Sequence, residues 1–472
     1  MPIKSIDIDH FAPSVKNLLD DIHRLIGPIY LVGGGLRNAL HGKFDTNEMD
    51  LLVPEALAEC RRKLLEGGIA SVEMGNRLNS LTIRLKQDQL PRIIHLSTFR
   101  HRPAYPITVE EDLLHRDITQ NAMAWPWPNG PLIDPFLGYQ DLLDNYIRLV
   151  NGVDTILEDP IRALRFFRFT MQFQGIPNSS DLNLCMESSL GSVMQKLIRA
   201  ELDRILSLPL TENTTKNHLI TLFNSHLGSQ ILPEVANLKL TKKASKQGEN
   251  DLEHTLRLVL AIKPPTEEED ISITDLRWAA LLHLLDCEEN FSEPTNQKKS
   301  SRSGLIIEDK MQVSADILDR LDFINRRKRD ILNLIYYLNK IPTTPTDRVL
   351  RRLFEMQIPL EGLFRLLAAK LEIKAHLKNS ERDKKCQECH RTLQRCQNMR
   401  LAQKRLHPVD LALNGGDILD MVRQPSGPWL GQLLQKLIDW VTQDPSRNRR
   451  DHLERRVLEW ISKNDLTAQS YK

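Results

Sequence analysis

The sequence lacks the features of a membrane protein and of a secreted, disulfide-bonded protein. No segment approaches the ~18 consecutive apolar residues that a membrane-spanning helix needs. The N-terminal segment has no basic start followed by an apolar core, which is the pattern of a secretory signal. The chain has only six cysteines in 472 residues, too scattered for a disulfide framework. We therefore expect a cytoplasmic protein without membrane contact.

An excess of charge of one sign is also missing. Lys and Arg number 64 and Asp and Glu 62, which leaves a formal net charge of +2. Any contact with a nucleic acid must therefore come from a local basic patch and not from the overall field. The densest basic stretch, Lys378 to Arg405, holds nine Lys or Arg and three acids. A solvated helix face is its more ordinary interpretation, and a binding surface is the alternative.

Three of the six cysteines lie within that stretch. Cys386, Cys389 and His390 match the spacing of a c-type haem attachment, and Cys396 follows. Side chains spaced along one continuous helix do not converge on a tetrahedral zinc ion without a break in the helix. We therefore interpret them as ordinary helix cysteines, with a zinc site as the alternative.

Short apolar runs typical of strands occur only in the first third of the chain, at residues 29–32, 50–53, 81–85 and 93–97, around helical patterns such as 54–67. From about Asp159 onward, apolar residues recur at intervals of three and four, as in amphipathic helices. The residues thus predict a small α/β unit followed by an almost wholly helical remainder. Polar interruptions at 263–270, 288–304 and 341–347 mark loops or boundaries.

The most informative segment follows the first predicted strand. Leu31-Val-Gly-Gly-Gly-Leu-Arg37 is a Gly-rich turn whose bare amides can hold phosphate oxygens. Beyond it, Glu48 and Asp50 occupy alternate positions of an apolar run, and therefore one face of a strand. This layout predicts a nucleotidyl transfer site, in which the turn and Arg37 hold a triphosphate and the carboxylates hold Mg²⁺. A tight strand-to-helix turn without any ligand is the alternative.

A second segment combines a cation, a carboxylate and an amide. Arg116 can bind phosphate, Asp117 can accept from a ribose hydroxyl, and Asn121 can bridge the two. A polar turn that enters a helix is the alternative interpretation.

A third segment repeats the pairing of carboxylate and arginine at the start of a predicted helix. Asp159 and Arg162 together can satisfy the donor and acceptor edges of a base. Arg165 and Arg168 continue at three-residue intervals, so we expect them on the same side of the helix. An amphipathic surface helix is the alternative.

In order and spacing, these segments resemble the head and neck of the class II tRNA nucleotidyltransferase and bacterial poly(A) polymerase family. The resemblance is carried by LVGGGLRNALHG with EMDLLV, EEDLLHRDITQNAMAW, DPFLGYQDL and EDPIRALRFFRF. It implies an α+β fold that begins with a small nucleotidyltransferase head with a mixed sheet. The implied domains are the head (1–150), a helical neck with the nucleotide-selecting motif (151–230), a degenerate HD-like helical body (231–340) and a helical RNA-binding tail (341–472).

The resemblance also implies an activity, namely template-independent addition of C and/or A residues to the 3′ end of tRNA or another RNA. The implied substrates are CTP and/or ATP, the implied cofactor is Mg²⁺, and pyrophosphate leaves. The residues implied for catalysis and metal binding are Glu48 and Asp50. Those implied for nucleotide binding are Gly33, Gly34, Arg37, Arg116, Asp117, Asn121, Asp159, Arg162, Arg165 and Arg168.

Three side chains in the head depart from the family pattern. Glu48 stands where the family usually has the shorter aspartate, Asn38 also replaces an aspartate, and His95 replaces an acid. A longer carboxylate can still bind Mg²⁺, but neutral imidazole supplies no anionic oxygen. Two alternatives therefore stay open: a catalytically weakened or inactive RNA-binding paralogue, and a poly(A) polymerase.

Two further departures lie in a loop and in the body. Only residues 101–110 separate Arg100 from Glu111, where many family members have a longer loop. In the family, a loop this short is similar to that of enzymes that add two C residues without the terminal A. His283 is followed by Leu284, where a working HD phosphohydrolase has aspartate. We therefore expect the body to be a scaffold.

Overall fold

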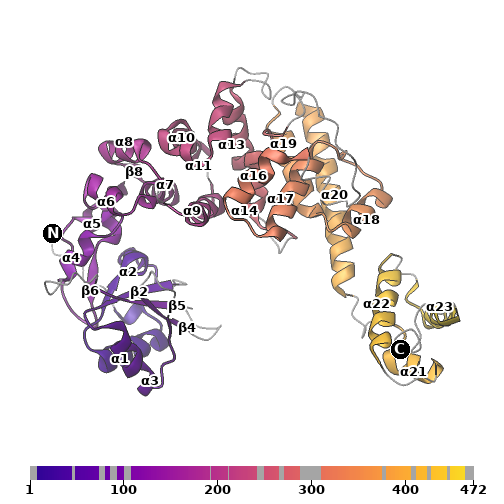
Figure 1. Ribbon diagram of the computed structural model, residues 1–472, viewed down its shortest axis with the longest axis horizontal. Coiled ribbons are helices and arrows are strands. Elements are labelled where there is room, and N and C mark those ends of the chain that lie inside the picture. Colours follow the sequence, from indigo (N-terminus) through magenta and orange to yellow (C-terminus); the bar gives the residue numbers. More distant parts are fainter. Residues whose placement is uncertain are drawn as a thin grey trace. The chain divides into compact units, whose positions relative to one another are not determined.

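The computed structural model describes residues 8–44, 48–73, 80–84, 93–99, 108–191, 193–210, 212–241, 249–264, 270–286, 310–374, 379–405, 411–422, 427–443 and 447–462. The chain forms two compact units, Met1–Thr266 with Ser272–Tyr336 and Glu267–Ile271 with Tyr337–Lys472. Figure 1 labels their elements. The predicted α+β class is confirmed, since a mixed sheet near the N-terminus is followed by helices.

The first unit begins with a six-stranded sheet in the order β3-β4-β5-β2-β1-β6. Strands β2 and β5 are parallel, and all the other neighbouring pairs are antiparallel. The strands are β1 Tyr30–Val32, β2 Glu48–Val53, β3 Val72–Glu73, β4 Ser80–Arg84, β5 Ile93–Thr98 and β6 Ala124–Pro126. The helices of this part are the 3-10 helix Ile8–His10, α1 Pro13–Ile26, α2 Gly33–Leu40, α3 Leu57–Glu66, α4 Val109–Leu114, the 3-10 helix Thr119–Asn121 and α5 Gly138–Leu143.

The two faces of this sheet carry different side chains. Leu51 of β2 and Leu96 of β5 are buried in a core that includes Leu19 of α1 and Leu64 of α3, and Figure 1 shows these two helices on one side of the sheet. Successive side chains of a strand alternate between faces. The even-numbered positions of β2 therefore point away from this core, toward the face that carries the predicted site.

The predicted strands match β1, β2, β4 and β5, and the helical pattern at 54–67 matches α3. The sequence interpretation missed β6, which is three residues long and ends in Pro126. It was also wrong to confine strands to the first third. Strand β8 (Ile176–Pro177) lies beyond that point and pairs in parallel with β7 (Tyr146–Ile147). Two-residue strands carry too few side chains to show a period of two.

Helices follow in the rest of this unit. They are α6 Gly152–Glu158, α7 Ile161–Phe173, α8 Ser179–Glu187, α9 Gln195–Ser207, α10 Glu212–Asn224, α11 His226–Ile231, α12 Pro233–Ala236, the 3-10 helix Asn237–Leu240, α13 Asp251–Ala261, α14 Ile273–Leu282, α16 Gln312–Arg320 and α17 Asn325–Leu338. The boundary between the units falls within α17. The further division into head, neck and body stays a prediction.

Two arginines join α9 to the helices that follow it. Arg277 of α14 is buried and donates to the carbonyls of Leu206, Leu208 and Ile262 at 2.6–2.9 Å. Its charge thus satisfies carbonyls at the C-terminal end of α9, where the helix dipole favours a cation.

The second arginine, Arg327 of α17, bonds to two carboxylates. It donates to Asp203 of α9 at 2.9 and 3.0 Å and to Asp275 of α14 at 2.6 and 2.8 Å. Trp278 Nε1 donates to the same Asp203 at 2.7 Å. Three helices are therefore fixed to one another by a single network of charged and polar groups.

The second unit contains α18 Asp347–Glu355, α19 Leu360–Glu372, α20 Asn379–Arg405, α21 Gly415–Val422, α22 Pro428–Gln443 and α23 Arg450–Ser462. Cys389 and Cys396 of α20 are buried as free thiols, and burial raises the pKa of each to about 12. Part of the basic stretch makes internal contacts, since Arg395 pairs with Asp347 and Arg400 pairs with Glu361. None of the described helices is long and apolar enough to span a membrane.

Candidate active site

The site is built around the turn between β1 and α2. Val32, the last residue of β1, pairs with Asp50 of β2, so the start of α2 lies beside that carboxylate. Gly33 has a φ of +64°, and a Cβ there would lie 2.9 Å from Asp50 Oδ2 and 3.5 Å from Arg116 Nη1. Any larger residue would be strained and would displace the carboxylate. The Gly-rich turn, a predicted metal ligand and a predicted phosphate contact therefore meet at one point.

Glu48 and Asp50 point to the same face of β2, because Met49 between them is buried in the core. Glu48 is exposed and Asp50 is half-buried. Burial, with a smaller contribution from Glu48, raises the pKa of Asp50, although Arg116, His95 and Arg37 oppose the shift. A carboxylate with this disfavoured negative charge is suited to bind a cation.

The described residues contain no cluster of three or more His, Cys, Asp or Glu placed to hold a metal ion. Two carboxylates nevertheless fit a hard divalent cation, because such an ion takes carboxylate oxygens from the protein and can complete its shell with phosphate oxygens and water.

His95 lies directly beside Asp50 on the same face. The two are cross-strand partners in the parallel pair β2–β5, and Thr82 of β4 is the next partner in the row. The Nδ1 atom of His95 is 3.2 Å from Thr82 Oγ1. The departure noted in the sequence therefore falls inside the site and not at its edge.

Arg37 of α2 is held from two sides. Only 7% of it is exposed, and its Nη1 donates to Asn121 Oδ1. Its guanidinium carbon lies 4.4 Å from the ring centroid of Phe173 at the end of α7. Burial lowers the pKa of Arg37 to about 10, against the attraction of Asp117 and Asp50 and with the repulsion of Arg168. Arg37 is therefore still a cation at neutral pH.

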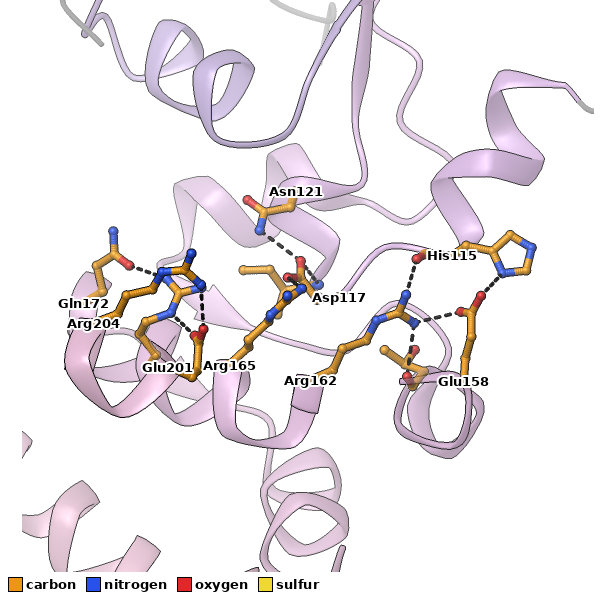
Figure 2. Close-up of polar contacts among 12 residues, drawn as sticks. His115, Asp117, Asn121, Glu158, Arg162, Arg165, Gln172, Glu201 and Arg204 are labelled. Atoms are coloured by element: carbon orange, nitrogen blue, oxygen red, sulfur yellow. Dashed lines mark hydrogen bonds and ion pairs between the residues drawn. The ribbon is translucent and has the colours of Figure 1, made fainter. Parts of the chain in front are cut away.

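Asn121 links Arg37 to the ion pair between Asp117 and Arg165, which Figure 2 shows. Its Nδ2 donates to Asp117 Oδ1 at 3.0 Å, and Asp117 Oδ2 lies 3.7 Å from Arg165 of α7. Burial opposes the ionisation of Asp117, but Arg165, Asn121, the backbone amide of Ile118 and Arg168 outweigh it and lower its pKa. Asp117 is thus a fixed anion at neutral pH.

Arg162 belongs to a separate cluster in Figure 2 and is 4% exposed. It donates to Glu158 Oε2 at 2.7 Å, to the Thr155 carbonyl at 3.1 Å and to the His115 carbonyl at 2.6 Å. The His115 ring in turn lies 2.9 Å from Glu158. Asp159 is adjacent, because its carbonyl accepts the Arg162 backbone amide at 3.0 Å. The sequence interpretation missed His115 and Glu158 as partners of Arg162.

The three arginines of α7 form different direct contacts. Residues three apart on a helix are rotated by about 60°, so Arg162 and Arg165 reach the different partners described above. Arg168 pairs with Glu201 of α9, which also binds Arg204 at 2.8 Å. The positive charge of Arg168 still lowers the pKa of both Arg37 and Asp117. A role of Arg168 in nucleotide binding stays a prediction.

Residues 29–148 match the family model described as the poly A polymerase head domain. Among curated proteins, the chain is 30% identical to the multifunctional CCA protein of Alkalilimnicola ehrlichii over 266 residues and 29% identical to that of Pseudomonas fluorescens over 267 residues. Each match covers 54% of this chain and 62% of the relative. The chain thus spans about three fifths of the length of the curated relatives it matches.

Two solved structures share the fold. The Bacillus stearothermophilus CCA-adding enzyme in complex with CTP aligns with a TM-score of 0.56 at 19% identity, over 96% of this chain and 99% of that one. A tRNA nucleotidyltransferase complexed with a primer tRNA and an incoming ATP analog aligns with a TM-score of 0.53 at 19% identity, over 80% and 98%. At this identity the likeness shows the fold alone.

Residues 29–148 thus form a head domain of the poly A polymerase type, within a chain that shares the fold of these solved structures. These matches agree with the resemblance seen in the sequence: the head of this chain is similar to poly A polymerase heads, and the chain is similar to multifunctional CCA proteins over 54% of its length.

Proposed function

We propose that this protein is a template-independent RNA nucleotidyltransferase that adds C and/or A residues to the 3′ end of tRNA. The observation that carries the proposal is the position of Gly33, whose missing Cβ leaves Asp50 Oδ2 and Arg116 Nη1 beside the start of α2. A triphosphate bound there would meet backbone amides, a cation and a metal carboxylate together. The names of the relatives and of the solved structures support the same activity.

In the proposed reaction the RNA 3′-hydroxyl oxygen bonds to the α-phosphorus of the nucleotide, the bond to the β-phosphate oxygen breaks, and pyrophosphate leaves while the hydroxyl proton is released. Glu48 and Asp50 would hold Mg²⁺, which supplies Lewis-acid stabilisation of the charge that develops. Arg37 and Arg116 would neutralise the triphosphate. The buried position of Arg37 strengthens this interaction, because water screens it less.

Base selection is proposed for Asp159 and Arg162. Arg162 is buried and bound to Glu158 in the present structure, so its guanidinium is already held in a fixed orientation. Contact with a base would require the exchange of one of these partners for the base edge. Asp117 and Asn121 would lie on the sugar side, and the helices of the second unit would hold RNA mainly through phosphate contacts.

The test is incubation of tRNA transcripts that lack the 3′ end with Mg²⁺ and each labelled nucleotide separately. We expect CTP or ATP to be incorporated and Asp50→Ala to abolish incorporation. Glu48→Gln should lower the rate and Glu48→Asp should keep it, because the shorter carboxylate still binds a metal. Glu66→Gln, which removes an exposed carboxylate of α3, is the matched control. No incorporation with any nucleotide or RNA acceptor would refute the proposal.

Two alternatives have distinct outcomes in the same assay. The position of His95 beside Asp50 favours an inactive RNA-binding paralogue. That protein would bind tRNA without metal-dependent binding of nucleotide. A poly(A) polymerase would instead add long runs from ATP alone. The choice of Mg²⁺ among divalent metals and a cytoplasmic location stay predictions.

A further inference from the structure

Four side chains form a continuous stack between α2 and the surface of α7 that faces α9. The Arg37 guanidinium lies over the Phe173 ring, as described above. The rings of Phe173 and Phe169 stack with centroids 5.6 Å apart and planes 14° apart. The Arg168 guanidinium carbon lies 4.0 Å from the Phe169 centroid. The order is therefore cation, ring, ring, cation.

This stack follows from helical spacing. Phe169 and Phe173 are four residues apart on α7, so their rings project from one face of the helix. Phe169 is buried and Phe173 is half-buried. Each of the two rings also lies against a guanidinium. An aromatic ring attracts a cation through the negative charge of its face.

The stack and the Asn121 bond restrain Arg37 in different directions. Asn121 accepts from Nη1 at the edge of the planar guanidinium, whereas Phe173 lies against its face. A group held at its edge and at its face cannot rotate freely about the long arginine side chain. Nη2, which lies 3.5 Å from Asn38 Oδ1, is 3.6 Å from the place where a Cβ of Gly34 would be. Arg37 is thereby held close to the backbone of the Gly-rich turn.

We propose that Phe173 is a positioning residue for nucleotide transfer: its ring holds the Arg37 guanidinium in place for the triphosphate and so couples the base-selecting helix α7 to the phosphate-binding helix α2. This inference rests on the proposed function. Phe173 itself touches no reacting group, so it acts through Arg37.

Three variants of the full chain test this role. Phe173→Leu keeps an apolar side chain but removes the ring face. Phe173→Tyr keeps the ring and is the matched control. Arg37→Gln removes the cation that the ring is proposed to hold, and Arg37→Gln with Phe173→Leu completes a double-mutant cycle. The measurements are the Kd for CTP and ATP, the KM for nucleotide and for truncated tRNA, and the urea midpoint of unfolding.

We expect Phe173→Leu to raise the Kd and KM for nucleoside triphosphate by about 3- to 10-fold, as for loss of a partly desolvated cation–π contact. The KM for tRNA should stay the same, and Phe173→Tyr should restore nucleotide binding. In the Arg37→Gln background, Phe173→Leu should add less than about 2-fold, because the cation is already gone.

The outcomes separate this inference from the proposed function. Unchanged nucleotide Kd and KM in Phe173→Leu, beside normal incorporation by the wild type, would overturn the inference alone. Full additivity in the cycle, or a loss that follows only the urea midpoint, would show a structural role and would also overturn it. A wild-type protein that neither binds nor incorporates any nucleotide would overturn both.

Discussion

The Gly-rich turn offers the sharpest test of the site, because function and stability should change in opposite directions there. Gly34 is the second residue of α2, and a Cβ at this position would meet only Arg37 Nη2 at 3.6 Å, an ordinary van der Waals distance. Gly34→Ala should therefore fold. Alanine is favoured over glycine in a helix by up to about 1 kcal/mol, so the free energy of unfolding should stay the same or rise by that amount.

Nucleotide binding should suffer in the same variant. A phosphate oxygen that accepts from the backbone amides of the turn must approach closer than a methyl group at Gly34 would allow. We expect kcat/KM for nucleotide to fall by about 10- to 100-fold, which corresponds to about 1.4–2.7 kcal/mol of lost transition-state stabilisation.

Gly35→Ala is the matched control. A Cβ at Gly35 would point to β2 and meet Met49 Cα at 3.5 Å and the Glu48 carbonyl at 3.7 Å, which are again ordinary contacts. The variant adds the same methyl group to the same helix, away from the proposed ligand. Incorporation of labelled CTP and ATP, with urea unfolding of each variant, measures both effects. Wild-type kinetics in Gly34→Ala, or an equal loss in Gly35→Ala, would refute the reasoning.

Arg277→Met should lower the free energy of unfolding in urea by about 3–5 kcal/mol, since three carbonyls lose a buried charged donor; a loss below about 1 kcal/mol would contradict this. In a double-mutant cycle with Asp203→Asn and Arg327→Gln, the unfolding energies should show a coupling of about 1–3 kcal/mol, and additive effects would show that the network is not cooperative. Asp50→Asn should stabilise the metal-free protein at pH 7, because burial raises the pKa of Asp50 and its ionisation costs stability. That gain should shrink as the pH falls from the raised pKa of folded Asp50 toward the ordinary pKa of an aspartate, and it should vanish below that value. Thermal unfolding at several pH values measures it, and a gain that persists below the ordinary pKa would contradict the cause.

The parts of the site that were predictable from the sequence are those set by local geometry. The alternation of a strand places Glu48 and Asp50 on one face, and the structure agrees. The turn at Gly33 needs a residue without a side chain, which the Gly run also indicates. Strands β2, β4 and β5 were recognisable because each has five or six residues, enough to show an apolar pattern.

Other parts depend on contacts between segments far apart in the chain. Nothing in the residues around Phe173 indicates that it meets Arg37, because an aromatic residue on an amphipathic helix is typical of a core. The pairing of Arg168 with Glu201 is equally hidden, since Glu201 lies on another helix. The sequence identified His95 as unusual, but its place beside Asp50 required the register of β2 and β5.

The amide of Asn121 has a consequence for how this chain can vary. Its oxygen accepts a hydrogen bond from the Arg37 guanidinium, and its nitrogen donates one to the Asp117 carboxylate, so only an amide in this orientation links the two. A hydroxyl is too short for both tasks, and a carboxylate in its place would repel Asp117. Natural relatives that keep both Arg37 and Asp117 should therefore also keep the amide at position 121.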